Sequence, residues 1–122
     1  MTRRARVLIG PARHHLATVS LADTPRSRAV GLLGRDRLAL GDGLLLAPCR
    51  LVHTFFMRFA IDVIFLDRAG RITRVHQAVR PFRFAWGGWA ARTTIELAAG
   101  SLSALDLPFA PEIHLEVELL RR

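Results

Sequence analysis

The segment Glu112-Ile113-His114-Leu115-Glu116-Val117-Glu118-Leu119 alternates strictly between polar and apolar side chains. Successive side chains of a β-strand point to opposite faces, so Ile113, Leu115, Val117 and Leu119 share one face. An α-helix would scatter these four residues around its circumference. The segment therefore predicts a strand with one face in the core and the other in water.

Other segments with the character of strands recur along the chain at intervals of roughly ten residues. Residues 61–66, Ile-Asp-Val-Ile-Phe-Leu, are apolar on both faces except for Asp62, which predicts a central strand. The turn sequence 67–70 predicts a hairpin into a strand over 71–79. The remaining expected strands are residues 6–9, 16–21, 44–46, 51–57 and 93–97. Residues 80–91 have no period and are expected to form a loop.

Helical signals are few. Residues 23–34 contain a cap at Asp23 or Thr24, Pro25 at the first helical position and Gly34 at the end, which predicts one short helix. A helical turn is expected over 102–105, before Pro108. The predicted fold is mainly β: a single-domain antiparallel β-sandwich or open barrel, with one or two short helices. We expect one domain over 1–122, in which residues 1–5 form a flexible basic N-terminus.

The charge of the chain does not indicate a nucleic-acid partner. All 18 basic residues are arginine, and the net charge is +8. Nucleic-acid-binding proteins normally use lysine as well, because a point charge suits phosphate. Five of the arginines are terminal, which leaves about +3 for the body, an ordinary value. We therefore expect no nucleic-acid partner.

Neither a membrane partner nor a cofactor is indicated. No apolar run is long enough to cross a bilayer, and the run behind the basic N-terminus is too short for a signal peptide. The single cysteine, Cys49, allows no intrachain disulfide, which fits a reducing compartment. No metal-binding, nucleophile-elbow or redox motif occurs. The sequence thus predicts a cytoplasmic protein without a cofactor or metal.

Two carboxylates lie within otherwise apolar strands. Asp62 is costly to bury unless it is paired or hydrogen-bonded. It is either a ligand-binding or acid–base group, or a structural residue paired with Arg58, Arg28 or backbone N–H groups, and we favour the structural role. Glu96 lies between Ile95 and Leu97. It could meet Asp62 or His53, although a solvated glutamate is the commoner outcome.

The remaining candidate ligand-binding residues are His53, Arg58, Trp86 and Trp89. His53 is the first residue of the segment 53–67, and Arg58 lies within the same segment. Trp86 and Trp89 lie in the glycine-rich segment 80–91. Aromatic residues on a loop can cover a pocket or stack on a ligand or partner, or they can simply close one end of a sandwich.

Three blocks, residues 28–35, 53–67 and 94–100, resemble in order and spacing the family of domains of unknown function numbered 192 (DUF192). The resemblance covers about residues 16–120 and implies a small β-sandwich of the jelly-roll type with no assigned reaction. This sequence departs from the family pattern at four positions. Within the blocks, structural roles are expected for Arg28, Gly31, Gly34 and Gly100.

Three functional hypotheses follow. The first is a non-catalytic domain that binds a small polar ligand, a saccharide or an organic anion, through His53, Arg58, Asp62, Glu96 and the Trp86–Trp89 loop. The second is a hydrolase-like enzyme in which Asp62 and Glu96 converge, with His53. The third is a protein-interaction module that uses the Trp86–Trp89 loop.

Overall fold

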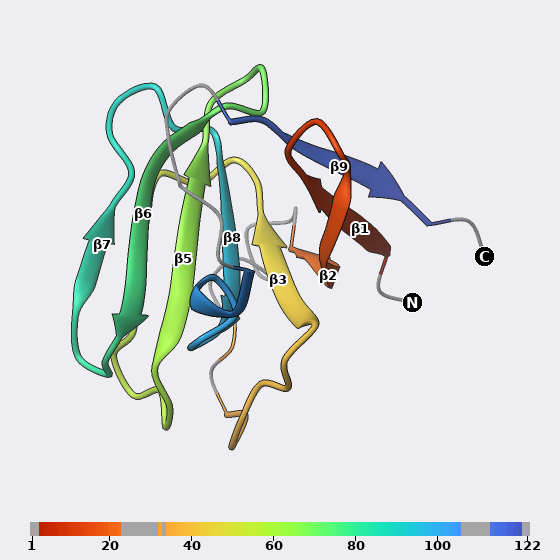
Figure 1. The fold of residues 1–122 in the computed structure, drawn as a ribbon. Helices are drawn as coiled ribbons and strands as arrows, with labels where there is room; N and C mark the ends of the chain where they lie inside the picture. Colours follow the sequence, from red (N-terminus) through yellow and green to blue (C-terminus); the bar gives the residue numbers. More distant parts are fainter. Residues whose placement is uncertain (1–2, 23–31, 33, 106–112, 121–122) are drawn as a thin grey trace.

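The computed structural model describes residues 3–22, 32, 34–105 and 113–120, and its elements are strands apart from one 3-10 turn. Figure 1 shows them in chain order. The strands are β1 (Arg4–Ile9), β2 (His14–Ala22), β3 (Asp42–Leu46), β4 (Leu51–His53), β5 (Ile61–Leu66), β6 (Ile72–Val79), β7 (Phe84–Trp86), β8 (Thr93–Ala98) and β9 (Leu115–Leu119), and the 3-10 turn is η1 (Ser103–Leu105). The predicted mainly β fold is confirmed.

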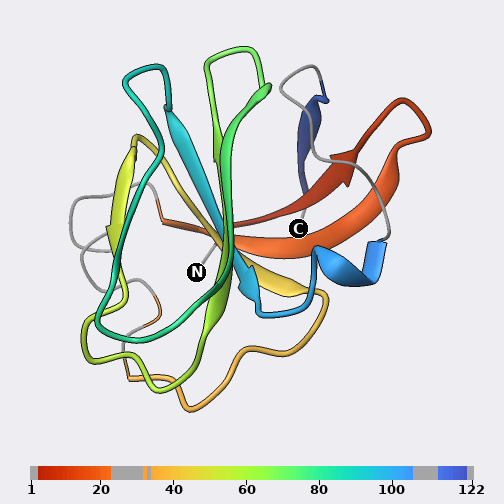
Figure 2. The same ribbon diagram turned by 60° about the vertical axis from the view of Figure 1, so that its left-hand side comes forward.

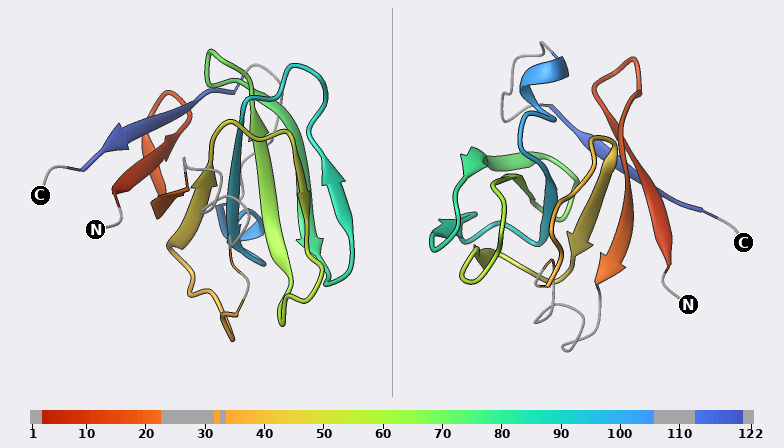
Figure 3. Two further views of the ribbon diagram at one scale, coloured as in Figure 1. Left: turned by 180° about the vertical axis from the view of Figure 1, so that it is seen from behind. Right: turned by 90° about the horizontal axis from the view of Figure 1, so that it is seen from below.

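Seven strands form one sheet in the order β6-β5-β8-β3-β2-β1-β9. The sheet curls into a half-barrel, as Figure 2 shows. Its strand pairs are antiparallel except for β2 and β3, which run parallel. The other two strands, β4 and β7, pair with each other in a separate antiparallel ribbon. The ribbon lies against one face of the sheet near β5 and β6 (Figure 3).

The central strand β5 is buried on both faces. Ile64 and Leu66 face a core formed with β1, β2 and β8. Ile61, Val63 and Phe65 face a second core, to which the β4–β7 ribbon contributes Val52 and Ala85. All six residues of β5 are buried, as its nearly continuous apolar sequence predicts.

Asp62, the polar residue of β5, is 1% exposed and satisfied by backbone donors. Its Oδ1 accepts a hydrogen bond from the N–H of Ala78 at 2.8 Å, and its Oδ2 accepts one from the N–H of Leu102 at 3.1 Å. The pairing of β5 with β6 shifts register between Ile61 and Val63, so Ala78 lies in a β-bulge. A bulged residue is left unpaired in the ladder, which leaves the N–H of Ala78 free to bond to Asp62. The carboxylate therefore anchors both the β6 bulge and the turn that leads into η1.

Two segments differ from the prediction. The strand expected over 51–57 ends at His53, because Thr54 bonds to the 80–83 segment and the carbonyl of Thr54 accepts the N–H of Met57 in a turn. The segment 80–91, expected to be a loop, contains β7. Its short alternation, Phe84 outward and Ala85 inward, was hidden by the glycines around it.

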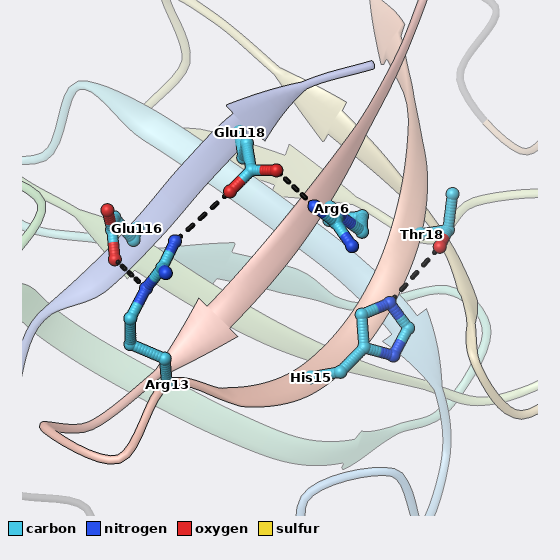
Figure 4. Close-up of polar contacts among 6 residues, drawn as sticks. All are labelled: Arg6, Arg13, His15, Thr18, Glu116 and Glu118. Atoms are coloured by element: carbon cyan, nitrogen blue, oxygen red, sulfur yellow. Dashed lines mark hydrogen bonds and ion pairs between the residues drawn. The ribbon is translucent and has the colours of Figure 1, made fainter.

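The edge strand β9 forms where its alternation predicts it, but its apolar face is only partly buried. Leu115 is buried, whereas Leu119 is 57% exposed, because β9 pairs with β1 alone. Ion pairs on the other face join it to the neighbouring hairpin. Figure 4 shows Arg6 and Arg13 both bonded to Glu118, with Arg13 also reaching Glu116 at 2.9 Å.

Several predictions concern the N-terminus, the expected helix over 23–34 and the glycines of the family blocks. The predicted helix over 23–34, with Arg28 and Gly31, lies outside the described residues apart from Leu32 and Gly34. Gly34 and Gly100 have φ angles of 84° and 93°, which suit glycine. β1 begins at Arg4, inside the segment expected to be a flexible terminus. None of the helical structure in the described part has the length and apolarity of a membrane span.

We predict that Asp62→Asn lowers the free energy of unfolding by about 2 kcal/mol, because an amide can accept from only one of the two buried N–H groups. Urea denaturation measures the change. The control is Asp36→Asn, which alters the exposed ion pair with Arg58 and should cost less than about 1 kcal/mol. Equal losses in the two variants would contradict the anchoring role of Asp62.

Candidate functional site

The two predicted carboxylates do not meet. In the antiparallel pairing of β5 with β8, Asp62 lies opposite Leu97 and Val63 lies opposite Glu96. Directly paired residues share a face and neighbouring residues along a strand do not, so Asp62 and Glu96 point to opposite faces of the sheet. This arrangement removes the convergence that the hydrolase hypothesis requires.

Glu96 is buried on the face covered by the ribbon. Its cross-strand neighbours Val63 and Leu44 both belong to the second core. Loss of water around the carboxyl group disfavours its charged form, and burial raises the pKa of Glu96 from 4.5 to about 7. Glu96 is thus a buried acid of the core, and the solvated position favoured from the sequence is wrong, because its side chain shares the face of Val63 and Leu44 that the ribbon covers.

His53 and Arg58 lie on the surface and have local partners. His53 ends β4, and its Nδ1 accepts the N–H of Phe55 at 3.3 Å. The Arg58 guanidinium is paired with the exposed carboxylate of Asp36. These contacts do not bring either residue to Asp62 or Glu96.

Aromatic side chains cover the outward face of the β4–β7 ribbon. Register places His53 opposite Phe84 and Leu51 opposite Trp86, while Val52 and Ala85 point inward. The aromatic contacts continue beyond both ends of the ribbon. They join Phe84 to Phe55 at 4.8 Å, Phe55 to Phe82 at 6.0 Å, Phe82 to Phe56 at 5.5 Å and Trp86 to Trp89 at 5.0 Å, measured between ring centroids.

The loop 87–92 that carries Trp89 is held by backbone and side-chain bonds. The N–H of Gly87 donates to Arg50 O at 2.8 Å, that of Arg92 to Leu66 O at 2.7 Å, and that of Cys49 to Arg92 O at 2.9 Å. Gly87 also lies directly on the Phe65 ring, where a Cβ atom would approach the ring to 2.3 Å. A residue without a side chain is therefore required there, and the loop is fixed against the core.

A cleft of about 460 Å³ opens between this loop and the β5–β6 turn. Its charged and aromatic lining comprises Arg50, Arg68, Arg71, Arg92, Asp67 and Trp89; we call it the arginine cleft. Trp89 is 80% exposed, and the guanidinium carbon of Arg50 lies 5.9 Å from the centroid of its ring. The other lining residues are Ala69, Ala90 and Ala91, so the charged groups of the lining are four guanidinium groups and one carboxylate.

The single acid of the arginine cleft is already engaged. The Asp67 carboxylate accepts the N–H groups of Ala69 and Arg71, both at 2.9 Å, and pairs with the Arg71 guanidinium. Burial alone would raise the pKa of Asp67, but these donors outweigh it and lower the pKa. Arg50, Arg68 and Arg92 therefore keep positive charge that the carboxylate of Asp67 does not neutralise.

Of the candidate residues from the sequence, Trp89 lines the cleft and Trp86 only contacts Trp89, whereas the four arginines of the cleft were not anticipated. The four arginines lie between positions 50 and 92, and they come together where Arg50 and the loop 87–92 line the same cleft as the turn 67–71. One signal was present, since residues 68–95 contain six arginines and no acidic residue. Among the described residues, no three His, Cys, Asp or Glu side chains gather where a metal ion could be held.

We predict that Glu96→Gln removes a pH-dependent loss of stability. Below pH 4.5 the acid is protonated in both states and contributes nothing. As pH rises to about 7 the unfolded chain releases the proton first, which destabilises the folded state. The interval between these pKa values corresponds to about 3 kcal/mol at pH 8. Urea denaturation of both proteins from pH 4 to pH 8 should show curves that diverge with pH; parallel curves would contradict the burial of this acid.

Comparison with known proteins agrees with this fold. The profile of the DUF192 family, described as Uncharacterized ACR, COG1430, matches residues 7–113. A UPF0127 protein of Thermococcus sibiricus is 39% identical over 67 residues, which are 55% of this chain and 43% of that protein. The match thus spans less than half the length of that relative.

Two crystal structures have similar folds. One, from Sinorhizobium meliloti and described as a candidate transcription regulator, has a TM-score of 0.73 at 23% identity and covers 96% of this chain and 94% of its own. The other, a Novosphingobium aromaticivorans protein of unknown function, has a TM-score of 0.77 at 18% identity, with 94% and 84% covered. At sequence identities this low, the structural similarity supports a common fold only. Because the family profile matches most of the chain, the resemblance found in the three sequence blocks is confirmed, and the chain belongs to the DUF192 family of uncharacterised proteins.

Proposed function

We propose that this chain is a non-catalytic binding domain for a small organic anion, held in the arginine cleft beside Trp89. The observation that carries the proposal is the meeting of Arg50, Arg68 and Arg92 in one concave site whose single carboxylate is already paired. Guanidinium groups bind carboxylate and phosphate through paired, charge-assisted hydrogen bonds. The exposed indole of Trp89 offers a flat apolar wall for the carbon skeleton of such a ligand.

The composition of the cleft favours an anion over a neutral saccharide. Sugar hydroxyls both donate and accept hydrogen bonds, so a sugar site needs acceptors as well as donors. Arginine has five donors and no acceptor. Asp67, the one side-chain acceptor among the lining residues, is already occupied by two N–H groups and a guanidinium. A ligand that supplies its own acceptors, such as a polycarboxylate or a sugar phosphate, fits this lining better.

Two features support binding without catalysis. The cleft lacks a free carboxylate or histidine among its lining residues, so general acid–base chemistry has no evident group there. The walls are also held in place before any ligand arrives, since Arg50 Nε donates to Ala91 O at 3.3 Å and the Thr73 hydroxyl donates to Gly87 O at 2.9 Å. Preformed walls reduce the entropy lost on binding.

We expect citrate and glucose 6-phosphate to bind the protein in isothermal titration calorimetry, and glucose to bind far more weakly. Arg92→Gln should weaken anion binding by about ten- to a hundredfold, because a charge-assisted hydrogen bond contributes about 1.5–3 kcal/mol. Trp89→Ala should weaken glucose 6-phosphate more than inorganic phosphate, which has no carbon skeleton.

The matched control is Arg37→Gln, which removes one arginine from the exposed segment between Gly34 and Leu40 at the opposite end of the half-barrel (Figure 1). It should leave anion binding unchanged. If Arg37→Gln weakens binding as much as Arg92→Gln does, the anions respond to net charge only. That outcome, or the absence of binding by every anion tested, contradicts the proposal.

A further inference from the structure

A second surface lies at the other end of the β4–β7 ribbon and uses none of the residues of the arginine cleft. It consists of Phe55, Phe56, Phe82 and Phe84, which we call the phenylalanine wedge, with Arg80 and Arg83 beside it. We propose that the wedge inserts into the surface of a bilayer that contains anionic lipids. The observations that carry the proposal are the exposure of these rings, the hydrogen bonds that hold the two backbone segments carrying them, and the positive charge of those segments.

Three of the four phenylalanine side chains of the wedge are exposed to solvent, and two of them have an unfavourable backbone conformation. Phe56 is 76% exposed, Phe84 is 64% and Phe82 is 56%, and each of the three contacts another ring of the wedge. Phe56 and Phe82 have φ angles of 65° and 64°, a region that bulky residues rarely adopt. Such strain persists only when the surroundings impose it, and it is concentrated at functional sites.

Thr54 imposes this geometry. Its buried side chain donates to Arg80 O at 2.6 Å and accepts the N–H of Arg83 at 2.9 Å. Its own N–H donates to Arg83 O at 2.9 Å, and its carbonyl accepts the N–H groups of Met57 and Phe82 at 3.2 and 3.0 Å. Thr54 thus holds together the two segments that carry the wedge, residues 54–57 and 80–84, which we call its two tips.

The same bonds suit the wedge to a poorly hydrated environment. A backbone N–H or carbonyl that enters lipid without a partner costs several kcal/mol. At these tips the N–H groups of Phe55, Met57, Phe82 and Arg83 already have intramolecular acceptors, and residue 81 is proline. The tips therefore present hydrocarbon rings with few unpaired backbone donors.

The two chain segments that carry the wedge contribute positive charge only, and the exposed carboxylate of Asp36, which comes from another segment, is paired with Arg58. Residues 43–61 and 68–95, which include both tips, contain no acidic residue. Arg80 and Arg83 are exposed, and neither has a carboxylate partner among the described residues. Cations beside exposed aromatic rings are suited to the interface of an anionic leaflet, where the rings enter the headgroup region and the guanidinium groups meet phosphate.

Other anionic macromolecules are less well matched to these features. A single-stranded nucleic acid needs ring faces spaced for successive bases, whereas the wedge rings pack on one another at 4.8–6.0 Å with two edge-on contacts. Such binding needs no membrane-spanning segment, because a wedge of this kind lies on the surface of the bilayer without crossing it.

Vesicle co-sedimentation of the full chain tests the proposal. We expect binding to phosphatidylcholine vesicles that contain phosphatidylserine, weaker binding to phosphatidylcholine alone, and a decline with salt. The double variant Phe56→Ser/Phe82→Ser should bind at least tenfold more weakly, because it removes two apolar side chains from the interface. Arg80→Gln/Arg83→Gln should abolish the preference for phosphatidylserine. All these positions are exposed, so thermal melting should show folded variants.

Two controls distinguish vesicle binding through the wedge from binding through any exposed apolar side chain or through net charge. Leu119→Ser removes an equally exposed apolar side chain on β9, and Arg13→Gln removes one charge from the β1–β2 turn; both should leave vesicle binding unchanged. Binding to oligo(dT), a single-stranded DNA, is measured in parallel. The proposal is overturned if no vesicle is bound, or if the phenylalanine variant binds vesicles as well as the original chain does. It is also overturned if that variant keeps vesicle binding and loses oligo(dT) binding. Because the wedge and the arginine cleft share no residue, the Arg92→Gln variant should still bind vesicles whether or not the anion proposal holds.

Discussion

The burial of β5 on both faces is the constraint on which the rest of the structure depends. A single curled sheet can cover one face of its central strand, and Ile61, Val63 and Phe65 on the other face require a second layer. The short β4–β7 ribbon supplies that layer through Val52 and Ala85. Because side chains alternate along a strand, fixing these residues inward fixes Leu51, His53, Phe84 and Trp86 outward. Two candidate binding surfaces then follow, one at each end of the ribbon.

Apolar patterns allowed most of the strands to be predicted, among them the period of two in 112–119 and the nearly continuous apolar run in 61–66. They failed at the ribbon, where the strands are three residues long and the sequence between them is rich in glycine and aromatics. Pairing of β4 with β7 and the bonds of Thr54 decide the structure there, and both are tertiary contacts with no local signature. The alternation in 112–119 placed β9 correctly but not the depth of its burial, because burial depends on what lies above an edge strand.

The candidate site was harder to predict than the fold. The structural role favoured for Asp62 agrees with its two backbone donors, whereas Glu96, for which a solvated position was favoured, is buried. Their orientation could not be read from the sequence, because it depends on the register between β5 and β8. The arginines of the cleft have no motif, and only the approach of two loops joins Arg50, Arg68 and Arg92. The pattern that did carry information was a long stretch without acidic residues.

We infer that anion recognition is localised in the arginine cleft, and the decisive measurement is nuclear magnetic resonance of the 15N-labelled chain during titration with citrate. We expect saturable shifts of the resonances of the Trp89 indole N–H and of the amides of 68–71 and 87–92, while the resonances of the amides of 55–57 and 82–84 stay unchanged. Shifts that rise linearly without saturation and are spread over arginines throughout the chain would contradict it, because they would show that citrate responds to overall charge and not to this site.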